Sequence, residues 1–165
     1  MRALTPERLQ FGGHCLIVLE RTLRAAEPEE GCALLLGTHS HTTLRVQWIW
    51  PCRNVWTPAE ERRQRFSLDP REQLLAQRWC RNRALTVLGA AHSHPTSAAV
   101  PSATDRQRCV GPTLMVIRSG LEPPPAHLRA WWMPEVGGAP PHLADPKELA
   151  IEPQPAAPGA EHLGE

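Results

Sequence analysis

The sequence lacks the cysteine pattern of a disulfide framework or of a cysteine-only zinc site. Its five cysteines are an odd number, and none of them forms a Cys-x-x-Cys pair. Frameworks and sites of that kind use paired cysteines at short spacings. The cysteines lie in apolar or helical surroundings, so we expect most of them to be small buried hydrophobic side chains. They are Cys15, Cys32, Cys52, Cys80 and Cys109.

Long apolar runs are also missing. No stretch reaches the length of a membrane span, and the first residues do not contain the apolar core of a signal peptide. The net charge is +1, so no global field marks the chain as a nucleic-acid binder. We therefore expect a cytoplasmic protein in a reducing compartment, with neither a membrane nor a nucleic acid as partner.

The charged residues are distributed unevenly along the chain. Residues 53–83 contain eight arginines and four acidic residues, whereas residues 134–165 contain one lysine and six acidic residues. These segments can be a solvated basic face and an acidic tail without further role. Alternatively, the basic segment is a rim that steers an acidic protein partner toward a functional site.

The length of 165 residues is that of one domain with a sizeable core. From Pro134 onward, prolines and acidic residues replace the periodic apolar residues. We predict a folded domain over residues 1–133 and a Pro-rich acidic C-terminal tail over residues 134–165 that is partly disordered. Within this tail, residues 143–152 can add an edge strand or a helical turn. Gly137-Gly138 is either a flexible linker or part of a self-inhibitory tail.

Hydrophobic periodicity predicts an alternation of helices and strands. Helices are expected over residues 5–26, 69–82 and 102–109, where a capping residue begins each segment. Strands are expected over residues 29–37, 43–50, 65–68, 85–91, 113–117 and 127–133, and the first two would form a hairpin. This order predicts an α/β or α+β layer fold with a mixed sheet.

Two apolar patterns predict which side chains are buried. Alternating residues are expected on one face of the strand 43–50, namely Leu44, Val46, Trp48 and Trp50. In the helix 69–82, the side chains expected to point inward are Leu74, Leu75 and Trp79, and Cys80 can join them.

The most informative stretch is His92-Ser93-His94-Pro95, followed by Ser102 and Asp105. If residues 85–91 form a strand, the two-residue period places both imidazoles on the same face at its end. Two imidazoles and the Asp105 carboxylate leave the fourth position of a tetrahedral metal open, which is typical of catalytic zinc. A His-x-His pair alone is weak evidence, and the prediction depends on the added Ser102 and Asp105.

Zinc with an open position lowers the pKa of bound water toward about 7. Hydrolysis also needs a general base that is not itself a ligand. Glu30 is the best candidate because it lies at the beginning of a buried strand, although Glu29 and Glu30 can also be an ordinary polar loop. Ser102 is either a hydroxyl donor to the developing oxyanion or the N-cap of the short helix.

Together, Glu30, His92-x-His94-Pro95, Ser102 and Asp105 resemble the motif of the JAMM/MPN+ (Mov34/MPN/PAD-1) zinc metalloproteases. The resemblance covers Pro6 to Met133, with Ala33 where the family usually has glycine. It implies an MPN/JAB-type mixed β-sheet flanked by helices, with cytidine-deaminase-like layering. It also implies one Zn²⁺ per chain on His92, His94 and Asp105, Glu30 as general acid/base, and Ser102 stabilising the tetrahedral intermediate.

The compact chain is similar to the small stand-alone prokaryotic branch of that family. The resemblance implies a metallopeptidase or isopeptidase that cleaves after the C-terminal Gly-Gly of a ubiquitin-like or sulfur-carrier protein. Backbone pairing with a strand edge is the expected recognition mode, and residues 51–63 or the strand after them can supply that edge or a flap. One alternative is a non-catalytic MPN-type binding module for ubiquitin-like proteins. A zinc deaminase is less consistent with the sequence, which has no Cys-x-x-Cys and no Glu beside a ligand.

Overall fold

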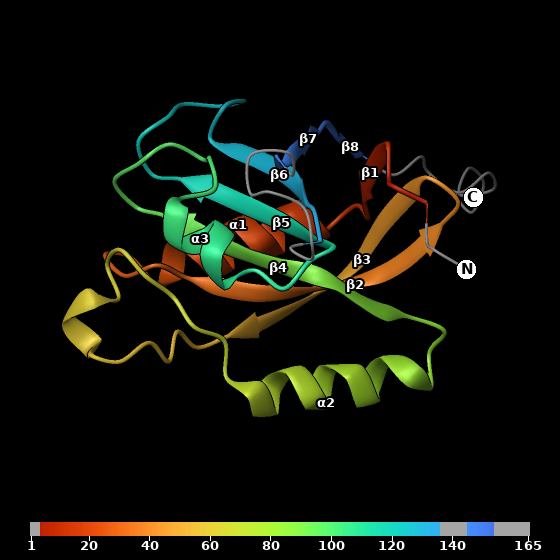
Figure 1. The fold of residues 1–165 in the computed structure, drawn as a ribbon, viewed down its shortest axis with the longest axis horizontal. Coiled ribbons are helices and arrows are strands. Elements are labelled where there is room, and N and C mark those ends of the chain that lie inside the picture. Colours follow the sequence, from red (N-terminus) through yellow and green to blue (C-terminus); the bar gives the residue numbers. More distant parts are fainter. Residues whose placement is uncertain (1–3, 136–144, 154–165) are drawn as a thin grey trace, which may run out of the picture.

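The computed structural model describes residues 4–135 and 145–153. In this part of the chain, eight strands form one mixed sheet in the order β7-β6-β5-β4-β2-β3-β1-β8, with three α-helices (Figure 1). The elements are β1 (Arg8–Phe11), α1 (Cys15–Ala25), β2 (Cys32–Ser40), β3 (Thr43–Cys52), a 3₁₀ turn (Ala59–Glu61), α2 (Pro70–Arg81), β4 (Thr86–His94), α3 (Ala103–Arg108), β5 (Thr113–Ser119), β6 (Leu128–Met133), β7 (Lys147–Leu149) and β8 (Ile151–Pro153). The predicted mixed α/β fold is therefore confirmed.

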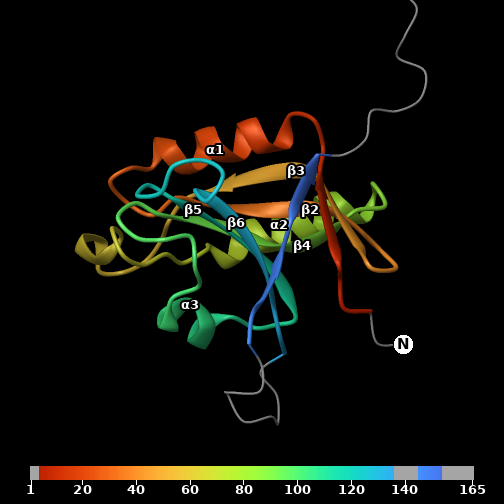
Figure 2. The same cartoon turned by 90° about the horizontal axis from the view of Figure 1, so that it is seen from above.

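The sheet is covered by helices on both faces, and Figure 2 shows α1 lying along one of them. The run Cys32–Leu36 of β2 is almost fully buried because side chains on both faces of the strand pack against other elements. Leu35 belongs to the core that includes Leu19 and Leu23 of α1. Leu34 and Leu36 pack on the opposite face, against α2. The site lies on this second face.

Several predicted elements are confirmed by the structure. β2 and β3 form the expected antiparallel hairpin, and α2 is capped by Asp69, whose carboxylate accepts the backbone N–H of Arg71 at 2.9 Å. β4 continues three residues beyond the predicted end and includes both histidines. It pairs antiparallel with β2 and parallel with β5, so the histidine pair is carried by the interior of the sheet.

The predicted helix over residues 5–26 is wrong in its first part. Residues Arg8–Phe11 form β1, which pairs in parallel with β3 on one side and with β8 on the other. Leu9 and Phe11 are buried in the core, and Gln10 accepts a hydrogen bond from Arg45 on β3. Gly12-Gly13 then separates this strand from α1, since glycine disfavours a continuous helix.

The predicted single face of β3 is also wrong. Leu36 pairs with Trp48 and Gly37 pairs with Val46, so Gln47 is an extra residue in a β-bulge. A bulge shifts the alternation by one residue, which moves all following side chains to the other face. Leu44 and Val46 therefore lie in the core with α1, whereas Trp48 lies against Trp79 of α2 at 5.2 Å between ring centroids.

Two further expectations differ from the structure. In α2, Cys80 is buried as the sequence allowed, together with Ala76, whereas Leu74 and Leu75 are exposed. Residues 65–68 do not form a strand, and the segment 53–69 is irregular apart from the 3₁₀ turn. Side-chain hydrogen bonds, rather than the backbone hydrogen bonds of a sheet, hold this segment in position.

The described part of the C-terminal segment supplies the strands at the two edges of the sheet. β7 pairs antiparallel with β6, and β8 pairs in parallel with β1, with only Ala150 between the two strands (Figure 1). Strands thus occur in the stretch where an edge strand or a helical turn was expected. The domain boundary after Met133 stays a prediction, and Gly137-Gly138 lies outside the described residues. None of the described helices is long and apolar enough to cross a membrane.

Candidate functional site

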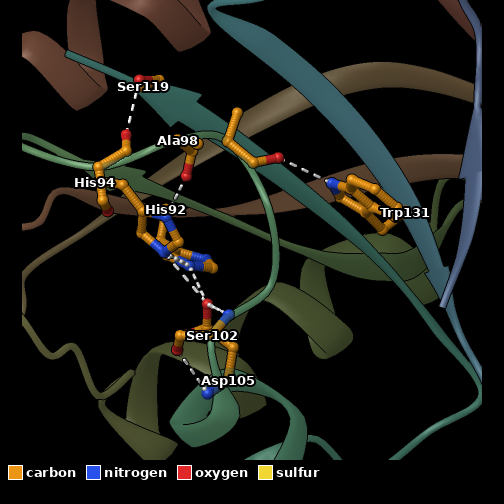
Figure 3. A network of polar contacts seen from close by, with 9 residues as sticks. His92, His94, Ala98, Ser102, Asp105, Ser119 and Trp131 are labelled. Carbon is orange, nitrogen blue, oxygen red and sulfur yellow. Dashed lines mark hydrogen bonds and ion pairs between the residues drawn. The ribbon is translucent and has the colours of Figure 1, made fainter. Parts of the chain in front are cut away.

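The two histidines lie side by side at the end of β4, on the face that α2 also covers. Both side chains are buried, and their Nε2 atoms are 3.1 Å apart. The two-residue period of the strand gives both rings the same direction, as the sequence predicted. Figure 3 shows both imidazoles pointing toward Asp105.

Asp105 reaches the histidines from the first turn of α3. Its Oδ2 atom lies 3.1 Å from Nε2 of His92 and 3.1 Å from Nε2 of His94. The helix begins with a capping box, in which Ser102 Oγ accepts the N–H of Asp105 at 3.0 Å and Asp105 Oδ2 accepts the N–H of Ser102 at 2.9 Å. The cap therefore fixes the carboxylate at the position where it meets both rings.

The three ligand atoms fit a metal ion. They all lie within 4.8 Å of one another. The Nδ1–H of His94 donates to the carbonyl of Ala98 at 2.7 Å, so Nε2 of the neutral ring is an acceptor facing a carboxylate oxygen, which is also an acceptor. A cation or a shared proton stabilises such an arrangement. His92, His94 and Asp105 can therefore hold a metal ion.

The protonation of the cluster follows from its contacts. Burial disfavours the charged form of Asp105, but its hydrogen bonds with His92 and His94 outweigh burial and hold its pKa well below the usual range. Burial lowers the pKa of His92. Burial also opposes the charge on His94, yet its bonds with Asp105 and Ala98 raise its pKa overall. A metal ion would thus compete with one proton on His94, and its affinity should fall as the pH falls.

The loop after Pro95 is fixed by contacts with β5 and β6. The carbonyl of Ala99 accepts the indole N–H of Trp131, and the carbonyl of Ser97 accepts the hydroxyl of Ser119 (Figure 3). These contacts place the Ala98 carbonyl that orients His94. A hydrogen bond to the second nitrogen of a ligating imidazole sets which nitrogen faces the metal.

His92 is oriented differently, because its Nδ1 atom has no hydrogen-bond partner among the described residues. Instead, Phe66 stacks on the ring, with 4.3 Å between the centroids and an angle of 18° between the planes. Sequence reasoning did not find this role for Phe66, because it comes from a segment without regular structure. No local periodicity signals such a contact.

We expect the substitution Phe66→Ala to weaken metal binding about 10- to 100-fold, the range found when groups behind a metal ligand are removed. Without the stacked ring, His92 gains rotational freedom that metal binding must remove. A competition titration against a chromophoric chelator measures the change. Phe66→Leu, which keeps apolar bulk without a planar ring, should give an intermediate value. Equal metal affinity in all three proteins would contradict the stacking role.

Glu30 lies in the same cavity as His94 and Ser102, a hollow of about 260 Å³. Its side chain is only 4% exposed, and its Oε2 atom has no hydrogen-bond partner among the described residues. Burial raises the pKa of Glu30 to about 8, while His94 opposes this rise and Asp105 adds to it. An ordinary polar loop would leave this carboxyl in water. The burial of Glu30 therefore argues against the polar-loop alternative.

Ser102 can combine the two roles that the sequence left open. Its oxygen caps α3 by accepting the N–H of Asp105, and the residue is exposed toward the cavity with Glu30. A hydroxyl that accepts one hydrogen bond still has its own proton to donate. The helix cap therefore does not exclude donation to a bound substrate.

A second cavity of about 470 Å³ lies beside His92. His92, Asp105 and Phe66 contribute to its lining, and apolar side chains of the sheet such as Leu34 and Met115 form part of it. Arginines lie at both cavities: Arg63 at the first, and Arg65 and Arg108 at the second. The steering role of the basic segment stays a prediction.

The sequence of this chain matches a known protein family and a known relative. A family model described as prokaryotic homologs of the JAB domain matches residues 15–134. A desampylase from Haloferax volcanii is 36% identical over 85 residues, which are 52% of this chain and 58% of that protein. The match therefore spans less than two thirds of the relative.

Two solved structures have a similar fold. The solution structure of a Desulfitobacterium hafniense protein has a TM-score of 0.74 and 26% identity, and the similarity covers 94% of this chain and 99% of the other. A Salinibacter ruber protein, also solved in solution, has a TM-score of 0.58 and 27% identity, with coverage of 94% and 95%.

Proposed function

Because the chain belongs to the prokaryotic homologs of the JAB domain, we propose that it is a zinc-dependent metallopeptidase or isopeptidase that cleaves after a C-terminal Gly-Gly. The membership confirms the family resemblance that the motif predicted. The observation that carries the proposal is the meeting of two kinds of groups at one site. His92, His94 and Asp105 converge in a group that could hold a metal ion, and the buried carboxyl of Glu30 shares a cavity with His94 and Ser102.

Bound zinc would supply a Lewis acid and a nucleophilic water of lowered pKa. His92, His94 and Asp105 would hold the ion, with the capping box keeping the Asp105 carboxylate in place. Glu30 would take a proton during attack and return it to the leaving amine as general acid/base. Ser102 would donate its hydroxyl proton to the oxygen that becomes negatively charged.

The substrate class is supported by the relative from Haloferax volcanii. That protein is a desampylase, which suggests a ubiquitin-like protein as the substrate here. We favour a sulfur carrier ending in Gly-Gly as the substrate, because the chain is similar to the small stand-alone prokaryotic branch of the family. Glycine offers no side chain to grip, so backbone contacts beside the metal cluster would provide recognition. We place the reaction in the cytoplasm, where the five cysteines would stay reduced.

The main alternative is a non-catalytic module that binds ubiquitin-like proteins with the same fold. The buried Glu30 carboxyl, whose Oε2 atom has no partner among the described residues, favours the enzyme, because a pure binding module gains nothing from this costly burial. Turnover distinguishes the two functions directly.

The experiment is a cleavage assay on a ubiquitin-like protein whose C-terminal Gly-Gly is linked to a reporter. We expect about one zinc per chain by elemental analysis, cleavage directly after Gly-Gly by mass spectrometry, loss of cleavage with a chelator, and recovery with added zinc. A sulfur carrier and ubiquitin should be compared as substrates. Tight binding without turnover would favour the binding module, and a protein that takes up no zinc would overturn the proposal.

A further inference from the structure

We propose that Asn54 is the positioning residue that fixes the backbone of Glu30 beside the metal cluster. This inference rests on the proposed function, because it assigns Asn54 a role in placing the general base. The starting observation is the place of Glu30 in the chain. It precedes β2, which begins at Cys32, so the hydrogen-bond ladder of the sheet does not hold it.

Other segments supply the bonds that the ladder does not. The carbonyl of Glu30 accepts Nδ2–H of Asn54 at 3.1 Å, and its N–H donates to the carbonyl of Arg62 at 2.7 Å. The following residue, Gly31, donates its N–H to Ser93 Oγ at 2.8 Å and accepts the N–H of Ser93 at 3.0 Å. Backbone groups on both sides of the Glu30 Cα are therefore bonded, while its Oε2 atom keeps no protein partner among the described residues.

Asn54 uses its whole amide group for this purpose. Nδ2 donates to the carbonyl of Arg65 at 2.8 Å as well as to Glu30, and it lies 3.5 Å from the carbonyl of Arg62. Oδ1 accepts the N–H of Trp56 at 3.1 Å and the N–H of Ser67 at 3.2 Å. An amide with two N–H donors and one carbonyl acceptor matches this set of backbone groups, whereas a carboxylate has no donor.

The same residue therefore couples the base to the second part of the site. Arg62, Arg65 and Ser67 belong to the irregular segment 53–69, which the amide of Asn54 gathers around itself. Ser67 follows Phe66, the ring that stacks on His92. Asn54 thus joins the backbone of Glu30 to the segment that orients a metal ligand, although Asn54 itself is outside the reacting groups.

The substitution Asn54→Asp tests this role with almost no change in shape. It keeps the acceptor for Trp56 and Ser67, removes the donors to Glu30 and Arg65, and sets a carboxylate against their carbonyls. A misplacement of a catalytic group by about 1 Å costs up to about 100-fold in rate. We expect kcat to fall about 10- to 100-fold, with a smaller change in KM. Asn82→Asp makes the same chemical change at an exposed position after α2 and should leave both constants unchanged.

Amide hydrogen exchange supplies a readout that does not depend on activity or on zinc. In the unaltered protein, the Glu30 and Gly31 amides should be protected like those of β2, although they lie outside its ladder. The Glu30 N–H donates to the carbonyl of Arg62, which lies in the segment that the Asn54 amide holds. In Asn54→Asp this segment loses its anchor, so protection of the Glu30 amide should fall by about tenfold, as when a hydrogen bond of ordinary strength is lost. Amides at the centre of β5 should keep their protection.

The outcomes separate this inference from the proposed function. Rapid exchange of the Glu30 amide in the unaltered protein would overturn the anchoring role, even if Asn54→Asp did not fold. Unchanged kcat and unchanged Glu30 protection in a folded Asn54→Asp protein would overturn it too. If the unaltered protein cleaves no Gly-Gly fusion but shows the expected exchange pattern, the proposed function fails while the anchoring of Glu30 by Asn54 stands.

Discussion

The substitution Glu30→Gln should lower cleavage of a Gly-Gly fusion by about 10²- to 10⁴-fold, the range that a general acid/base contributes. Zinc content should stay at about one per chain, because Glu30 is not one of the three converging ligand residues. Glutamine has nearly the same shape, and the Oε2 atom it replaces has no hydrogen-bond partner among the described residues. Single-turnover assays together with elemental analysis measure both quantities.

The pH dependence gives the same prediction a second test. Burial raises the pKa of Glu30 to about 8, and a bound cation would lower it from there by stabilising the carboxylate. A base must be ionised, so kcat/KM should fall as the pH decreases through the pKa of Glu30, which in the metal-loaded enzyme lies below about 8. Glu29→Gln changes the neighbouring carboxyl and should keep both the rate and the profile. Full activity in Glu30→Gln would refute the role of Glu30 as the base.

Stability should respond in the opposite direction to activity. In the metal-free protein, the folded state holds the Glu30 proton more tightly than the unfolded chain, since its pKa is raised. Folding stability therefore falls as the pH rises from about 4.5 toward about 8. Glu30→Gln removes this dependence, so its thermal midpoint should exceed that of the unaltered metal-free protein near pH 8 and approach it near pH 4.

The metal cluster was predictable because its geometry is local. His92 and His94 share a strand, and their two-residue period fixes a common direction without knowledge of the rest of the fold. Ser102 and Asp105 are three residues apart, as a capping box requires. The position of Glu30 depends on the pairing of Cys32 with His92 between β2 and β4, which the sequence indicates only through the buried character of both strands.

The elements that were missed depend on distant partners. β1 is a strand because it pairs with β3 and β8. When those partners are unknown, Leu9 fits the apolar stripe of a helix that continues through Leu16 and Leu23. The bulge at Gln47 turns Trp48 toward α2, and nothing in the alternation of β3 signals the extra residue. Local pattern specifies which residues are apolar, but pairing decides which face they occupy.

Asn54 and Phe66 show the same limit at the site itself. Each lies in an irregular segment and contacts its partner through a single side chain, Glu30 in one case and His92 in the other. Asparagine in a proline-containing loop is ordinarily a turn residue, and a lone phenylalanine is ordinarily core. Only the fold distinguishes these ordinary roles from the anchoring and stacking contacts observed here.

The second large effect is expected from Asp105→Asn, which should reduce zinc affinity by more than about 100-fold and remove cleavage with it, since a direct ligand matters more than the groups behind it. The amide oxygen of the new side chain can still accept the N–H of Ser102, so the cap of α3 persists while the charged ligand is lost. Asp145→Asn is a matched control, because Asp145 pairs with Arg106 of the same helix at 3.3 Å.

A comparison of the two metal-free proteins separates the ligand role of Asp105 from its contribution to folding. Its pKa is held low by His92 and His94 against the effect of burial, so its carboxylate stabilises the fold above the ordinary pKa of 3.8, and this stability is lost as the pH falls. Metal-free Asp105→Asn should therefore be less stable than the unaltered metal-free protein at pH 7, and the difference should narrow below about pH 4. If zinc affinity were unchanged while this stability difference appeared, Asp105 would be only a structural partner of the histidines, and another residue would have to supply the third zinc ligand.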